Sequence, residues 1–132
     1  MRVRCSLGLE LKKYFGHYLL RTTNLMALCA IDSDKALTAQ FEMNDDIASQ
    51  TAYFQSALLY TNTRCEKVIR VFTLPVSASS DLRQVFDGVD YGVLTNVVGK
   101  MAINKALESN LGNSREAVLN ICVEIIASYM KV

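Results

Sequence analysis

The stretch Phe54–Val76 constrains the fold most, because it has the pattern of two long β-strands joined by a tight turn. It reads FQSALLYTNTRCEKVIRVFTLPV. Apolar and polar side chains alternate along its first half, as in a strand with one buried face. The polar or small residues of Asn62–Cys65 suit a reversal, and Pro75 lacks a ladder donor where the second strand should stop. The pattern predicts a β-hairpin.

The same period of two predicts which side chains of the hairpin point to the core. We expect an inward row of Phe54, Ser56, Leu58 and Tyr60 on the first strand. The matching row on the second strand is expected to be Ile69, Val71 and Thr73. The structural core predicted for this half of the chain is Phe54, Leu58, Tyr60, Ile69 and Val71.

The sequence pattern changes near residue 77. Before it, alternating segments predict strands at Arg2–Cys5, Tyr14–Arg21 and Ala36–Glu42; after it, apolar residues recur every three or four positions, as in helices. We therefore predict an α+β chain, with an incomplete antiparallel β-sandwich over residues 1–76 and a helical region over residues 77–132.

Capping residues predict where the first two helices begin and end. We expect the first helix to begin after Ser79 or Ser80 and to end at Gly88. Asp90 is the expected N-cap of the second helix, which should end at Gly112.

The third helix has the clearest start signal. Asn113 is the expected N-cap, and Glu116 stands where a capping box needs it. Asn113→Ala is therefore predicted to cost about 1 kcal/mol of stability. The apolar residues expected to form the helical core are Leu94, Val98, Met101, Ile121 and Ile125.

Composition excludes several classes of protein. With 51% hydrophobic residues, the 132-residue chain can bury a core. Its 14 basic and 13 acidic residues give a net charge of +1, so nothing drives broad binding to nucleic acid. Charged residues interrupt the first segment where a signal peptide needs an apolar core, and no later run is long enough to span a bilayer.

The four cysteines are far apart in the sequence and include no C-x-x-C pair that would prepare a metal or redox site. Without a secretory signal, we interpret Cys5, Cys29, Cys65 and Cys122 as free thiols in a reducing compartment.

Two acidic clusters could in principle bind calcium. They contain Asp32, Asp34, Asp45 and Asp46. Neither has the glycine and closing glutamate of a calcium-binding loop, so we interpret both as solvated turns.

No catalytic or cofactor motif is visible. His17 is the single histidine, and it lies in a predicted strand between Gly16 and Tyr18. A half-exposed strand histidine explains it better than a catalytic base, because active sites need several converging groups. Phosphate-loop, dinucleotide and hydrolase-elbow patterns are absent from the sequence. We predict no enzyme activity, no catalytic residue, no metal site and no cofactor.

The hairpin also resembles a segment of the cargo-adaptor branch of the Sec23/Sec24 family, the inner coat of COPII vesicles. The resemblance rests on the FQ-ALLYT run of Phe54–Thr61, on Ile69–Val71 and on Thr73–Val76. Flanking pieces agree in order, so it spans nearly the whole chain: Met1–Ser6, Gly8–Leu9, Phe15–Gly16, Leu20–Thr23, Asp87–Asp90, Met101–Ala102 and Ser114–Ala117. The chain departs from the family where Lys67 and Val68 replace a basic pair, where Phe72 replaces a histidine, and in a shortened link between Thr73 and Pro75.

This resemblance implies a role for a longer parent protein. The family's members pair with a sister coat subunit, are recruited to the endoplasmic reticulum by a small GTPase and gather cargo. We therefore expect a cytoplasmic protein at the periphery of that membrane, with the family's zinc site outside this stretch. The chain begins directly in a strand and stops inside a helical pattern, so we expect a fragment whose sandwich has at least one unpaired edge, which predicts self-association or loose behaviour.

Five basic residues could form a membrane-facing patch. They are Arg2, Arg4, Arg64, Lys67 and Arg70. The family's place on an acidic membrane suggests that role, with each residue contributing about 1 kcal/mol near anionic lipid. An ordinary charged sheet surface is the favoured alternative, because Glu42 and Glu66 lie nearby in sequence and weaken the field.

Three functional classes remain. The resemblance favours a structural, protein-binding part of a coat adaptor in transport from the endoplasmic reticulum to the Golgi. The second class, an independent enzyme or small-molecule module, would need converging polar groups. The third is a stand-alone interaction module that uses an apolar outer strand face of Val68, Phe72 and Leu74.

Overall fold

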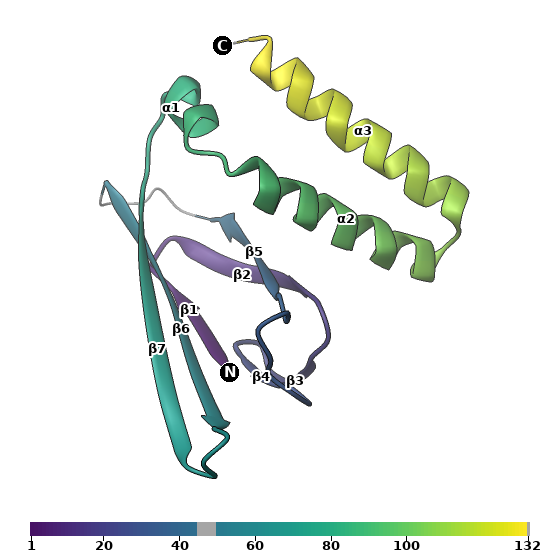
Figure 1. Ribbon diagram of the computed structural model, residues 1–132. Coiled ribbons are helices and arrows are strands. Elements are labelled where there is room, and N and C mark those ends of the chain that lie inside the picture. The colour runs from purple at the N-terminus through teal and green to yellow at the C-terminus, as the bar shows by residue number, and fades with distance from the viewer. Residues whose placement is uncertain (45–49, 132) are drawn as a thin grey trace. The chain divides into compact units, whose positions relative to one another are not determined.

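The computed structural model describes residues 1–44 and 50–131. The chain divides into two compact units, Met1–Ala78 and Ser79–Val132, which we call the β unit and the helical unit. Two residues of the second expected acidic turn, Asp45 and Asp46, lie outside the described residues. An antiparallel β region followed by helices confirms the predicted α+β class (Figure 1).

In the described part of the β unit, seven strands form two sheets, and all pairings are antiparallel. The five-stranded sheet has the order β3-β4-β1-β6-β7, and the two-stranded sheet pairs β2 with β5. The strands are β1 (Arg2–Cys5), β2 (Leu9–Phe15), β3 (Leu19–Thr22), β4 (Leu25–Ala27), β5 (Thr38–Met43), β6 (Thr51–Thr61) and β7 (Lys67–Ser77).

The core of the β unit lies between the two sheets. Val3 and Met26 of the larger sheet pack with Tyr14 of the smaller one, and all three are at most 8% exposed. Phe54 of β6 contacts Phe41 of β5, with 4.8 Å between ring centroids. The face of the large sheet that carries Val3, Met26 and Phe54 is therefore its inner face, and the opposite face is its outer face.

The hairpin of β6 and β7 pairs over its full length without a register shift, from Thr51↔Ser77 to Thr61↔Lys67. Opposed residues share a face, so the inner row of Phe54, Ser56, Leu58 and Tyr60 meets Leu74, Phe72, Arg70 and Val68. The expectation that Ile69, Val71 and Thr73 join that row is wrong. They lie on the outer face, opposite Leu59, Ala57 and Gln55.

Burial also corrects the predicted core of the hairpin. Ile69 and Val71 are 67% and 55% exposed, whereas Phe54, Leu58 and Tyr60 are partly buried. The physical reason is that β7 has large apolar side chains in both rows, so alternation could not identify the inner one.

Pro75 does not end the second strand, because β7 continues to Ser77. Its partner Tyr53 directs both backbone groups toward the β1 side: Tyr53 N–H donates to Ser6 Oγ, and its carbonyl accepts from Ser6 N–H. The pair Tyr53↔Pro75 therefore exchanges no ladder bonds. The nitrogen of Pro75 faces the edge of β7 with which no described strand pairs, and proline is tolerated at such an edge.

The turn between β6 and β7 is organised by Asn62. Its side-chain oxygen accepts from the N–H groups of Arg64 and Glu66, at 2.9 and 3.0 Å. Cys65 adopts a φ of 61°, in the left-handed region. This local bonding confirms the predicted site of reversal.

The expected strand Tyr14–Arg21 is interrupted. β2 ends at Phe15, His17 lies in a bend, and β3 begins at Leu19, so the prediction of a strand histidine is wrong. Gly16 has a φ of 134°, and a Cβ there would lie 2.6 Å from Leu37 Cδ2. The glycine allows a turn that another residue would obstruct.

The helical unit contains α1 (Leu82–Asp87), α2 (Tyr91–Glu108) and α3 (Leu111–Tyr129). Asp90 caps α2 as predicted, since its side chain accepts from Gly92 and Val93 N–H. The N-cap of α1 is Asp81 rather than either serine, although Ser79 Oγ accepts from Asp81 N–H. Gly88 is the C-cap of α1, as expected.

The start of α3 differs from the prediction. Asn110 is the N-cap, and its side chain accepts from Asn113 N–H at 2.9 Å. The backbone N–H of Asn113 is therefore capped by Asn110, and Asn113 is not itself the N-cap. Gly112, which was expected to end α2, lies inside α3. A Cβ on Gly112 would approach Asn110 Oδ1 to 3.2 Å, so glycine leaves room for the cap.

Helices α2 and α3 pack side by side in an antiparallel pair (Figure 1). Ser114, the one buried residue in α2 and α3 as described, donates from Oγ to the carbonyl of Ala102 at 2.7 Å. Phe86 and Tyr129 meet edge to face, with 5.4 Å between centroids. The residues expected to form the helical core are only partly buried: Leu94, Val98, Met101, Ile121 and Ile125.

Candidate functional site

Within residues 1–44 and 50–131, no group of three or more His, Cys, Asp or Glu side chains is placed to hold a metal ion. The described cysteines are free thiols, three of them exposed. Asp32 forms a local turn, because its carboxylate accepts from Asp34 N–H at 3.1 Å. The features that could serve a function are surfaces and one polar cluster.

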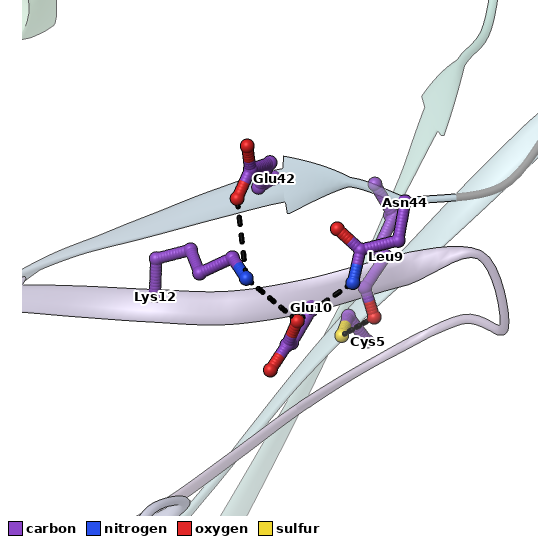
Figure 2. Close-up of polar contacts among 6 residues, drawn as sticks. All are labelled: Cys5, Leu9, Glu10, Lys12, Glu42 and Asn44. Atoms are coloured by element: carbon purple, nitrogen blue, oxygen red, sulfur yellow. Dashed lines mark hydrogen bonds and ion pairs between the residues drawn. The ribbon is translucent and has the colours of Figure 1, made fainter.

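The polar cluster lies on the two-stranded sheet (Figure 2). Glu10 and Glu42 stand directly opposite each other on β2 and β5, which is unfavourable for like charges. The register shifts between Leu11 and Lys13, so Lys12 is an extra residue. Its ammonium lies 2.7 Å from Glu10 and 3.2 Å from Glu42, and this bridge offsets the repulsion.

Asn44 completes the cluster by donating to Glu10 at 2.6 Å. Hydrogen bonds from Lys12 and Asn44 lower the pKa of Glu10, and the charge of Lys12 adds to this effect. Hydrogen bonds to Glu10 and Glu42 raise the pKa of Lys12. The cluster is exposed, and its single cation bridges two carboxylates, which suits a structural tie between strands better than a binding site.

Sequence reasoning missed this cluster. Its signal is the Glu-x-Lys spacing of Glu10 and Lys12. The partners are Glu42 of β5 and Asn44, which follows that strand and lies 34 residues from Glu10, so the cluster depends on the sheet register.

Two titratable groups of the β unit are buried or partly buried. Cys5 Sγ contacts the carbonyl of Leu9 at 3.2 Å, and burial raises the pKa of its thiol. The Tyr14 hydroxyl is buried without a partner among the described residues, and burial raises its pKa as well. Both groups stay neutral near pH 7, which favours packing roles.

The structure does not bring all five predicted basic residues to one face. Arg2 and Arg4, on either side of Val3 in the sequence, project on the outer face, whereas Val3 projects on the inner face. The register places Lys67 on the outer face too. Arg70 lies in the inner row, with its guanidinium 5.9 Å from the centre of the Tyr60 ring. Arg64 is in the turn.

Charge is nevertheless segregated between the sheets. The strands of the five-stranded sheet contain no Asp or Glu, and their charged residues are all basic: Arg2, Arg4, Arg21, Lys67 and Arg70. Glu42 belongs to the other sheet and pairs with Lys12, while Glu66 lies in the turn and accepts from Asn62. Glu42 therefore does not intersperse with the basic residues, whereas Glu66 lies between Arg64 and Lys67, as the sequence suggested.

The apolar strand face expected on the outside is also displaced. Val68, Phe72 and Leu74 lie in the inner row of β7, although Phe72 and Leu74 remain 59% and 60% exposed. The outer face of the sheet instead exposes Tyr53, Leu59, Ile69 and Val71.

The helical unit has an apolar pocket of about 540 Å³ between α2 and α3. Three of the predicted core residues, Leu94, Val98 and Ile125, line it. Gly99 and Ala102 have small side chains, which leave space for the pocket on its α2 side.

No described helix is long and apolar enough to cross a membrane.

Comparisons with known proteins relate both units to one family. Residues 1–79 match the Sec23/Sec24 beta-sandwich domain. The protein transport protein SEC24 of Dictyostelium discoideum is 44% identical over 129 residues, which are 98% of this chain and 13% of that protein. Human Sec24A is 32% identical over 130 residues, with 98% of this chain and 12% of the relative covered.

A solved structure agrees across both units. The crystal structure of the human COPII-coat protein Sec24c matches 98% of this chain and 18% of its own, with a TM-score of 0.90 and 28% identity. This chain thus spans a small part of the relatives that it matches. With the sandwich match over residues 1–79 and Sec24 relatives aligned along almost its entire length, the chain belongs to the Sec23/Sec24 family.

Proposed function

We propose that this chain is a structural, protein-binding part of a COPII cargo adaptor that acts in transport from the endoplasmic reticulum to the Golgi. The observation that carries the proposal is the similarity to SEC24 proteins, which extends over 98% of the chain and crosses both units. A match restricted to the sandwich would support only a shared module.

The role is structural and not enzymatic. The relatives are transport and coat proteins, and no cofactor is required for the scaffolding that we assign to this stretch. The parent protein pairs with a sister coat subunit, carries cargo and lies on the cytoplasmic side of the endoplasmic reticulum membrane. The boundary between sandwich and helical region is part of the proposal, with the sandwich ending near residue 76.

We also propose a membrane-facing role for part of the basic surface. Arg2, Arg4 and Lys67 share the outer face of a sheet whose strands lack acidic residues. Each is worth about 1 kcal/mol near an anionic bilayer at low salt. Vesicles with and without phosphatidylserine test this by sedimentation: Arg2→Glu with Arg4→Glu should abolish salt-sensitive binding, and equal binding to neutral vesicles would refute it.

A chimera tests the coat function itself. The 132-residue chain replaces the matching stretch of Dictyostelium SEC24, and secretion and recruitment to membranes are measured in cells that lack the native protein. Activity close to the native level supports the adaptor role. A matched chimera with Met26→Asp, which disrupts the sandwich core, should fail.

A chimera that folds and stays abundant but cannot support secretion would overturn the proposal. The exposed apolar pocket of the helical unit would then favour the alternative of a separate interaction module.

A further inference from the structure

We draw no further inference here: the strongest candidate, the apolar pocket of about 540 Å³ between α2 and α3, carries none, because nothing in the described part of the chain shows what covers it.

Discussion

The two units differ in how completely they bury their apolar residues. Among the described residues, the β unit buries five hydrophobic side chains from segments far apart in sequence, whereas α2 and α3 bury only Ser114 and leave many large apolar side chains exposed. A sandwich closes a core between two sheets, but two antiparallel helices each cover only one stripe of the other. The β unit should therefore respond to core mutations much more strongly than the helical unit.

The largest expected effect is at the centre of the β unit. Met26 is 2% exposed, and Met26→Ala should cost about 3 kcal/mol through lost burial and a cavity. Leu94→Ala in the helical unit should cost about 1 kcal/mol, because Leu94 is only partly buried. Urea unfolding read by amide exchange reports each unit; equal losses would contradict the comparison.

The cap of α3 provides a smaller and more local test. Asn110→Ala should lower the stability of the helical unit by about 1 kcal/mol, because Asn113 N–H loses its acceptor. Asn113→Ala should have little effect, in contrast to the cost expected from the sequence. Thermal melts followed by circular dichroism compare the two, and the reverse order would restore Asn113 as the cap.

Ser114 tests whether one buried hydrogen bond holds the helix pair together. Ser114→Ala removes the donor to the Ala102 carbonyl and should cost about 1 kcal/mol, measured by urea unfolding. Ser128→Ala, on the exposed end of the same helix, is the control and should be neutral. A larger loss in the control would mean that the bond contributes little.

The smallest effect is expected from Lys12, and its sign depends on pH. The pKa of Glu10 is lowered in the folded chain, so its contribution is present above the unfolded carboxyl pKa and is lost as pH falls through the folded value. The raised pKa of Lys12 gives a contribution that is present below the unfolded amine pKa and is lost as pH rises through the folded value.

Lys12→Ala should therefore lower the melting temperature slightly at neutral pH and converge with the unmodified chain in acid. Thermal melts across the acid range measure this difference. High salt should shrink it as well, since the cluster is exposed. A difference that persists unchanged in strong acid would show that the methylene stem, and not the charge, matters.

The sequence allowed good prediction of features that depend on neighbouring residues. The Asn62 turn, the Asp90 cap and the end of α1 at Gly88 each rest on bonds within a few residues. The features that were predicted wrongly depend on contacts that the local sequence does not specify. The side of the sheet to which Ile69 and Val71 point depends on the register of an apolar strand. The start of α3 depends on which of two asparagines adopts the extended conformation.

The candidate surfaces were harder to predict for the same reason. Five basic residues could be found by inspection, but only the register shows that Arg70 faces away from Arg2 and Arg4. The charge bridge at Lys12 needs a β-bulge and a partner strand, which no local pattern specifies.

The unbroken register of β6 and β7 also limits how this stretch can change in length during evolution. Deleting one residue within β7 would exchange its two rows beyond that point, so that side chains such as Phe72 and Val71 would swap faces. Two compensating changes, or a change confined to the Asn62–Glu66 turn, would preserve both faces. Changes of length before Thr73 should therefore be confined to the turn, whereas the shortened link between Thr73 and Pro75 affects only the last residues of β7.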